Sequence, residues 1–533
     1  MKSKISKTAC AVTSSLAFGL LFNTLAAAQV PEPNTSADIL ITGGTIYPGG
    51  ADPYVGDIAI SDDRIVFVGP RYSGTALRTI EAKGMIVSPG FIDTHTHVGD
   101  ALSSALPAAR LVMPFLTQGV TTAFIGVDGG GETDISAVFG KATGRDYGIN
   151  FASYVGLGAL RKNVIGSEDR APTKAELTQM VTIVDEAMCQ GALGLSTGLF
   201  YAPQSYAKEG EVVTLAKVAA KHGGVYDSHI RDESSYTVGL ESAVSEALSI
   251  GKEAGIPVHI AHIKALGVDV HGKASTIIGA IEKAQSAGQV VHADQYPWSA
   301  SGTGLDAALL PRWAQDGGRK STLERFDDPP QMAKIRTEMT DNLRRRGGPT
   351  SLLITSGPDD VKGKTLEEIA TETGADPVQA AIDLLRRFDL SVASFNQDEA
   401  DIATFMNRPW VMTSSDASRG HPRYYASYAR KYDTYVKDRK VINLRQFIDQ
   451  STSVPAKSFS LEGRGTLSKG AFADVVVFDP ETYAPRATFV EPTLFSTGVQ
   501  TVLVNGVLAI DEGMPTGTAA GRPLPRKSGV SGC

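Results

Sequence analysis

The residues with the clearest chemical meaning are two histidines that follow an apolar run, in the segment Gly90-Phe91-Ile92-Asp93-Thr94-His95-Thr96-His97. Side chains two residues apart in a strand lie on the same side, so His95 and His97 are predicted to present both imidazoles to one face. The alternative is a pair of exposed loop histidines. Only nine histidines occur in 533 residues, and both of these end an apolar run. We therefore predict that they bind a metal ion.

Three further residues with ligand-type side chains, His229, His262 and Asp416, each end a later apolar run. Imidazole nitrogens with a carboxylate are ordinary ligands of catalytic Zn²⁺, which keeps an open position for water. One such residue alone would fit a structural role, and Asp416 could simply cap a loop. Together with the histidine pair, they predict a zinc site that holds one or two ions.

These residues require a scaffold that brings several strand ends together. From about residue 89 to 463, short apolar runs alternate with segments of helical periodicity, which predicts parallel βα units. So many units favour a TIM-type (β/α)8 barrel, whose active site lies at the carboxyl ends of the strands. An open, doubly wound sheet is the alternative α/β fold, but no GxGxxG motif follows the first strand.

Strand-like patterns at both ends of the chain predict a second, smaller domain. Residues 37–88 and 464–525 contain short apolar runs between Gly and Asp turns, which indicates one small β-sandwich built from both termini. Within the barrel region, a polar and basic stretch predicts an insertion at about 306–350. Its three consecutive arginines, 344–346, are interpreted as a solvated charged face.

The composition is that of an ordinary globular protein, with 42% hydrophobic and 20% charged residues. A net charge of −7 disfavours nucleic acid as a partner. The expectation of a small-molecule substrate rests on the resemblance described below. The oligomeric state is not predicted. Cys10 lies in the leader described next, so only Cys189 and Cys533 remain, and a disulfide framework is not expected.

The first 28 residues resemble an export signal. Three lysines precede an apolar stretch, and Ala26-Ala27-Ala28 supplies small residues for cleavage before Gln29. An uncleaved membrane anchor is the alternative, although Thr, Ser and Asn interrupt the apolar stretch. The sequence therefore predicts a periplasmic or secreted protein that is not attached to a membrane after cleavage.

Several motifs spread over the chain together resemble one protein family. The Gly-Leu-Ser-Thr-Gly-Leu run at 194–199 and the His-Ile-Arg-Asp-Glu run at 229–233 are its most specific parts. The sequence is similar to the amidohydrolase superfamily, and within it to the N-acyl-D-amino-acid deacylases, or D-aminoacylases. The matching segments are 90–97, 118–122, 191–199, 228–233, 293–298, 363–366, 415–416, 421–423 and 470–479.

This resemblance implies a division of the metal ligands. His95 and His97 would hold one metal position with Asp416, and His229 with His262 would hold the other. Many deacylases have a ligating cysteine in an Asn-Cys-Gly turn, where this chain has Asp128 before a glycine. A carboxylate is a harder ligand but still a normal one for zinc, and it can bridge two ions. Alternatively, Asp128 is only a turn residue, and the number of zinc ions stays open.

The resemblance also implies an activity, which is hydrolysis of the amide bond of N-acyl-D-amino acids to a carboxylate and a free D-amino acid. Asp416 would accept a proton from the attacking water and pass it to the leaving amine. Glu233 is expected to orient a ligand imidazole. The residues expected to contact the substrate are Lys264, Tyr296, Arg423 and Tyr201, each of which could instead be a surface or core residue.

Three other functions remain open at this stage. The first is a dipeptidase acting on peptides with D-residues. The second is a cyclic-amide hydrolase, which normally needs a bridging lysine, whereas Lys162 is expected to be exposed. Leu157, near the position where relatives often have a histidine, is assigned no role. The third is a non-catalytic binding module, from which loss of metal ligands would be expected. Acyl-chain and side-chain preferences are not predicted.

Overall fold

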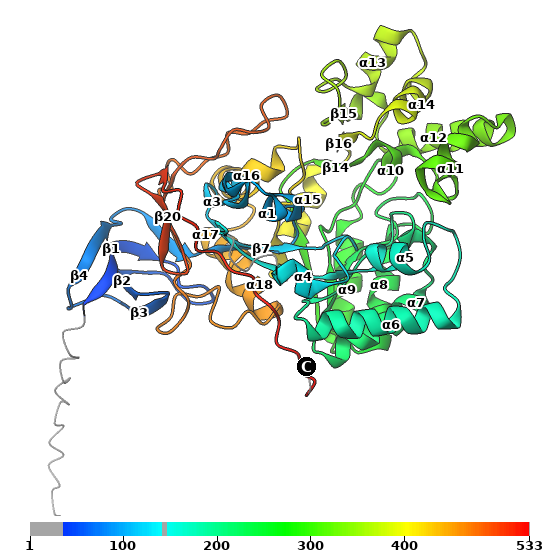
Figure 1. Ribbon diagram of the computed structural model, residues 1–533. Coiled ribbons are helices and arrows are strands. Elements are labelled where there is room, and N and C mark those ends of the chain that lie inside the picture. The colour runs from blue at the N-terminus through cyan, green and yellow to red at the C-terminus, as the bar shows by residue number, and fades with distance from the viewer. Residues whose placement is uncertain (1–35, 141–145, 532) are drawn as a thin grey trace, which may run out of the picture.

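The computed structural model describes residues 36–140, 146–531 and 533, and the expected leader at 1–28 lies outside them. A TIM-type α/β barrel forms the centre of the molecule (Figure 1), as predicted. Its parallel strands follow the chain in order, and a bridge between Thr96 and Ala417 brings the end of the last strand beside the end of the first. The strands are β6 (Phe91–Asp93), β7 (Val120–Ile125), β8 (Asn150–Ser153) with β9 (Val155–Gly156), β10 (Gly194–Gly198), β11 (Val225–His229), β12 (Val258–Ile260), β13 (Val291–Gln295) and β17 (Val411–Thr413).

Amphipathic helices cover the outside of the barrel. In α8 (Leu240–Ala254), Val244, Ala247 and Ile250 are buried at helical spacing against the strands. The other principal helices are α6 (Lys174–Cys189), α7 (Glu209–Lys221), α9 (Ala274–Ser286), α15 (Glu399–Met406), α16 (Arg423–Arg430) and α17 (Leu444–Ser451). Shorter helices connect them: α1 (Gly99–Ser103), α2 (Pro107–Arg110), α3 (Met113–Leu116), α4 (Ile135–Gly140), α5 (Leu157–Val164) and α18 (Ser453–Ser458).

Both chain ends build the second domain. β5 and β18 pair antiparallel, with Ser88 opposite Val476, and this pairing joins the N-terminal and C-terminal strands in one sheet. Side chains from both parts, such as Ile58 and Val475, share a single core. The strands are β1 (Ala37–Ile46), β2 (Tyr54–Ser61), β3 (Arg64–Gly69), β4 (Ala76–Glu81), β5 (Ile86–Pro89), β18 (Val475–Phe478), β19 (Val499–Val504), β20 (Val507–Asp511) and β21 (Met514–Pro515).

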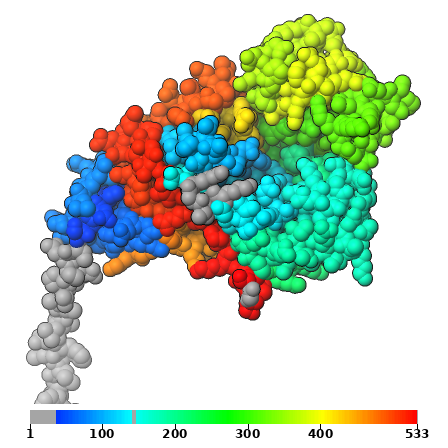
Figure 2. All heavy atoms as spheres, in the orientation of Figure 1, coloured from blue at the N-terminus to red at the C-terminus, as the bar shows by residue number. Residues whose placement is uncertain are grey.

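An insertion between β13 and β17 forms a separate lobe, coloured green to yellow at the upper right of Figures 1 and 2. It includes the predicted insertion at 306–350 and extends beyond it on both sides. The strands β14 (Ala300–Gly304), β16 (Ser391–Phe395) and β15 (Leu352–Ile354) form an antiparallel sheet in that order. The helices are α10 (Leu305–Leu309), α11 (Gly318–Phe326), α12 (Pro329–Arg345), α13 (Leu366–Thr373) and α14 (Pro377–Arg387), and the lobe has its own apolar core.

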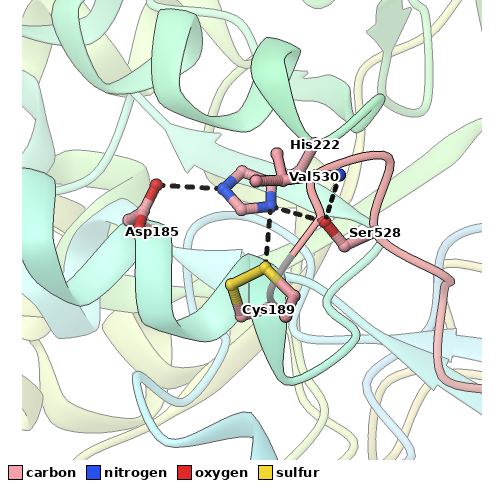
Figure 3. The surroundings of a disulfide bond; sticks show 6 residues. Asp185, Cys189, His222, Ser528 and Val530 are labelled. Carbon is pink, nitrogen blue, oxygen red and sulfur yellow. Dashed lines mark hydrogen bonds and ion pairs between the residues drawn. A yellow bond between two sulfur atoms is a disulfide. The ribbon is translucent and has the colours of Figure 1, made fainter.

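The C-terminal segment returns to the barrel and corrects the expectation of two unpaired thiols. Pro523 pairs with Phe151 in β8, and Arg526 donates its backbone N–H to Gly191. Cys533 then forms a disulfide with Cys189 at the end of α6 (Figure 3). No local pattern in the sequence marks this pair, because 344 residues separate the two cysteines and only the path of the C-terminal segment brings them together.

Next to this disulfide, His222 at the end of α7 holds the segment. Its Nδ1 lies 2.8 Å from Ser528 Oγ and its Nε2 lies 3.0 Å from Asp185 Oδ1. Within the ranges that the structure describes, no helix is both long and apolar enough to cross a bilayer.

Candidate metal-dependent active site

The ligand-type side chains predicted from the sequence meet at the carboxyl ends of the barrel strands. The ligand atoms of His95, His97, Asp128 and Asp416 all lie within 4.8 Å of one another. His97 Nε2 is 3.3 Å from Asp128 Oδ2 and 3.2 Å from Asp416 Oδ1. His95 Nε2 is 3.3 Å from Asp128 Oδ1. Asp128 also belongs to a second group of ligand-type side chains, so the two groups form one continuous cluster.

The second group contains Asp128, His229 and His262. His229 Nδ1 lies 3.4 Å and His262 Nε2 3.3 Å from Asp128 Oδ1. The carboxylate of Asp128 therefore lies between two pairs of imidazoles, and it would be available as a ligand to an ion held by either pair. This arrangement favours the ligand role of Asp128 over that of a plain turn residue.

The polar atoms of this cluster test whether the residues fit zinc. Both ring nitrogens of His95 and His229, and Oδ1 of Asp128, are buried and have no hydrogen-bond partner among the described residues. Buried polar atoms are normally paired, so several orphaned acceptors that face one another need a shared partner. Nitrogen and carboxylate oxygen donors are those that zinc prefers. The cluster therefore fits one or two zinc ions.

Three of these residues have backbone conformations that non-glycine residues rarely adopt. The φ angles are 54° at Asp128, 35° at His262 and 47° at Asp416. Left-handed conformations cost free energy and persist where the surrounding structure imposes them, most often at functional sites. Each of the three lies just after a strand, where such a turn directs the side chain toward the common centre.

Two buried aspartates, which were not among the residues expected at the site, hold two of these turns in place. Asp93 Oδ1 accepts the backbone N–H of Ser415 at 3.0 Å, and so fixes the turn that carries Asp416. Asp294 Oδ1 accepts the backbone N–H of His262 at 2.9 Å. Their signal in the sequence was a carboxylate at the end of a buried apolar run.

Glu233 contacts the outward nitrogens of two predicted ligands, as expected for a residue that orients imidazoles. Its Oε1 lies 3.2 Å from His262 Nδ1, and its Oε2 lies 3.6 Å from His229 Nε2. Lys264 Nζ donates to Glu233 Oε1 at 2.6 Å and to the carbonyl oxygen of His262 at 3.0 Å. Burial would raise the pKa of Glu233, but the charge of Lys264 and the two histidines lower it, so the carboxylate is ionised.

Asp416 has a cationic partner on its other side. Arg423 Nη1 lies 2.7 Å from Asp416 Oδ2, and Arg423 Nη2 donates to Ser418 Oγ at 3.0 Å. Burial would raise the pKa of Asp416, yet the charge of Arg423 and the hydrogen bond from His97 hold this pKa well below its usual range. Asp416 is therefore ionised, with its orientation fixed from two directions.

A cavity of about 310 Å³ opens beside the cluster, and the four predicted substrate-binding residues all line it. The Tyr201 ring lies 4.7 Å from that of His229, and Tyr296 Oη accepts a hydrogen bond from Gln397 at 2.9 Å. Its far wall comes from the insertion, including Ser301 and Thr303 of β14. The four residues are Tyr201, Lys264, Tyr296 and Arg423.

One cavity residue lies among the three consecutive arginines that were all expected on a solvated face. That interpretation is wrong for Arg346, which is 1% exposed and lines the cavity. It holds for Arg344, whose side chain is exposed and pairs with Asp269. Lys162 is exposed outside the metal-ligand cluster, and Leu157 is buried in the apolar core of the barrel, so neither belongs to the site.

Comparison with known proteins agrees with this geometry. The model of the amidohydrolase family matches residues 152–510. D-aminoacylase from Alcaligenes xylosoxydans xylosoxydans is 30% identical over 92% of this chain and 98% of its own length. A solved D-aminoacylase, studied for its binuclear metal centre, has a TM-score of 0.79 at 30% identity, and covers 92% of this chain and 100% of its own.

A further solved relative links the fold to zinc. N-acyl-D-glutamate deacylase from Bordetella bronchiseptica was solved with zinc and a phosphonate inhibitor that mimics the tetrahedral intermediate of its reaction. It has a TM-score of 0.80 at 31% identity, with 92% of this chain and 100% of that chain covered. The barrel, the metal-ligand cluster and these likenesses over nearly the whole chain show that the protein belongs to the amidohydrolase family.

Proposed function

We propose that this protein is a zinc-dependent deacylase that hydrolyses the amide bond of N-acyl-D-amino acids. The observation that carries the proposal is the Asp128-centred cluster, in which four histidines and two aspartates converge on a cavity that is also lined by Lys264, Arg346 and Arg423. Relatives that match this chain over most of its length are a D-aminoacylase, an N-acyl-D-glutamate deacylase and an N-acyl-D-aspartate deacylase, which supports N-acyl-D-amino acids as the substrate class.

The residues divide the chemistry among them. His95, His97, His229, His262 and Asp128, with Asp416, would hold the zinc. When bound, zinc supplies Lewis-acid chemistry, which makes a water molecule nucleophilic near neutral pH and polarises the scissile carbonyl group. Asp416 is placed to take a proton from that water and to deliver it to the nitrogen of the leaving amine.

Side chains in the walls of the cavity orient the substrate. Arg423 lies against Asp416 at 2.7 Å, so a substrate carboxylate bound by its guanidinium places the amide beside the proton acceptor. Tyr296 packs beneath that guanidinium, with Arg423 Cζ 5.0 Å from the ring centroid. Lys264 already donates to Glu233 and His262, so its contribution to substrate binding is mainly the positive potential of the wall.

Stereospecific amine release from an N-acetyl amino acid panel tests the proposal. Hydrolysis of the D-isomers, little hydrolysis of L-isomers, loss of activity on zinc chelation and recovery on zinc addition are expected. Hydantoin and dipeptides with D-residues belong in the same panel. A protein with full zinc content that releases no amine from any N-acyl-D-amino acid would contradict the proposed activity.

We also propose that the protein acts in the periplasm or outside the cell. The leader-like pattern of residues 1–28 supports export, and the disulfide between Cys189 and Cys533 is of a kind typical of oxidising compartments. Amino-terminal sequencing of protein from its native host is expected to begin near Gln29. Protein that begins at Met1 and remains in the cytoplasm would refute export.

A further inference from the structure

Arg346 is a buried cation with spare hydrogen-bonding capacity. It follows α12 and lines the cavity with 1% of its surface exposed. Its Nε donates to the carbonyl oxygen of Ala308 at 3.1 Å, but its Nη1 is buried and has no hydrogen-bond partner within the part of the chain that the structure describes. A buried charge is costly unless it is paired, so this guanidinium needs an anion.

The other fixed cations of the cavity already have carboxylate partners. Lys264 contacts Glu233 at 2.6 Å, and Arg423 contacts Asp416 at 2.7 Å. The third carboxylate of the cavity, Asp128, lies among the histidines. Each of these two cations therefore has a carboxylate partner from the protein, whereas no carboxylate of the described residues pairs with Arg346.

Two aromatic rings, those of Phe200 and Tyr236, lie between the metal ligand His229 and Arg346. The Phe200 ring lies 5.6 Å from the His229 ring and 5.6 Å from the Tyr236 ring, and Arg346 Cζ lies 5.7 Å from the Tyr236 centroid. A substrate whose amide lies at the ligands, with its α-carboxylate near Arg423, would present a more distant part of itself to Arg346.

We propose that Arg346 binds a second carboxylate of the substrate, so that the enzyme prefers N-acyl-D-amino acids with two carboxylates over those with one. This inference rests on the proposed function and concerns the same cavity. Arginine suits the role because its planar guanidinium makes two parallel hydrogen bonds to a carboxylate. The second carboxylate lies either on the amino-acid side chain or on the acyl group, and both have the same chemistry.

The test compares substrates that differ in this one charge. N-acetyl-D-glutamate is paired with N-acetyl-D-glutamine, and N-succinyl-D-leucine with its terminal amide, N-succinamoyl-D-leucine. Because a charge-assisted hydrogen bond is worth a factor of about 10–100 in affinity, we expect kcat/KM of the wild type to favour one dicarboxylate by that factor. The pair that shows the preference identifies which part of the substrate Arg346 contacts.

The variant Arg346→Met keeps the length of the side chain but removes its charge. It is expected to lower the ratio of the two kcat/KM values toward one, mainly through the KM of the dicarboxylate, while turnover of the member of the pair with one carboxylate changes less than about threefold. Arg346→Lys, which keeps charge without the planar fork, should give an intermediate ratio. Arg344→Met is the matched control, because Arg344 is exposed and pairs with Asp269; its ratio should equal that of the wild type.

Zinc content and circular dichroism of each variant show whether it is folded. Inhibition of the wild type by D-glutamate relative to D-glutamine gives a measurement that needs no variant, and the dicarboxylate should inhibit more strongly if the side-chain carboxylate is bound. Two results would overturn the role of Arg346 without touching the deacylase function. One is a wild type with equal kcat/KM for both members of each pair. The other is a folded Arg346→Met variant whose kcat/KM falls by the same factor for all four substrates. Failure of zinc-loaded wild type to hydrolyse any of the four substrates overturns the deacylase function as well.

Discussion

The two walls of the cavity are built in different ways. On the barrel wall, ligand-type side chains project from turns after parallel strands, and several are held by a buried partner, as Asp416 is by Arg423. The insertion wall, from β14 and β16, offers hydroxyl groups and Arg346, which has few internal partners. The barrel wall is thus preorganised for chemistry, whereas the insertion wall is completed by the substrate. Substitutions on the two walls should therefore act on different kinetic parameters.

The largest effect is expected from removal of a barrel ligand. His229→Ala or His262→Ala should lower bound zinc and reduce kcat/KM by more than ~100-fold, because each ring is one of only a few protein ligands. Metal analysis of the purified variants and amine-release kinetics measure both quantities. Full zinc occupancy with normal turnover in both variants would remove the barrel wall from the chemistry.

Asp416→Asn should come next, with loss of proton transfer as the main effect. Asparagine keeps the size and one oxygen acceptor but cannot accept a proton at neutral pH, and general acid–base catalysis typically contributes about 10²–10⁴-fold. We expect kcat to fall by that factor and KM to change less, with zinc retained by His229, His262 and Asp128. Near-normal kcat in a zinc-loaded variant would leave Asp416 with the role of a loop cap.

Glu233→Gln tests how far the preorganisation of the barrel wall extends. The neutral amide cannot balance Lys264, which donates to Glu233 at 2.6 Å, and it orients the two imidazoles less firmly. Loss of such an orienting partner typically costs about 10–100-fold in metal affinity or activity. Zinc titration against a competing chelator measures the affinity, and an unchanged zinc affinity would show that the imidazoles are oriented without this carboxylate.

A substitution on the insertion wall should have a smaller and different effect. Thr303→Val removes a hydroxyl that lines the cavity and lies 3.5 Å from Tyr201 Oη, while the volume is kept. Because a neutral hydrogen bond contributes about 1 kcal/mol, KM should rise a few-fold with kcat nearly unchanged. A loss in kcat comparable with that of Asp416→Asn would contradict the separation of the two walls.

The smallest effect on activity is expected at the disulfide. Cys189 ends α6, the helix before β10, so it lies toward the opposite end of the barrel from the cavity. Cys533→Ser should leave kcat and KM unchanged but lower the thermal midpoint, since a native disulfide typically contributes about 2–4 kcal/mol of stability. Differential scanning calorimetry with and without reductant provides the measurement. A thermal midpoint of the wild type that does not change when reductant is added would contradict this contribution.

The pattern of apolar runs and polar residues in the sequence was enough to predict the barrel and most of the candidate site, and the reason is physical. Strands bury continuous apolar runs, and barrel sites lie at their carboxyl ends, so a histidine or aspartate after such a run is already marked in the sequence. His95, His97, His229, His262 and Asp416 all carry this local signal. Asp128 carried a weaker one and depended on a resemblance to be noticed.

What only the tertiary structure decided involves pairs of distant segments. The sequence has no periodicity that tells buried Arg346 from exposed Arg344, because the burial of each depends on the lobe that packs over it. The disulfide between Cys189 and Cys533 likewise depends on the route of the C-terminal segment across the barrel. Local patterns record which face of a strand or helix is buried. They do not record which remote residue will lie opposite it, since that contact is set by the packing of the whole chain.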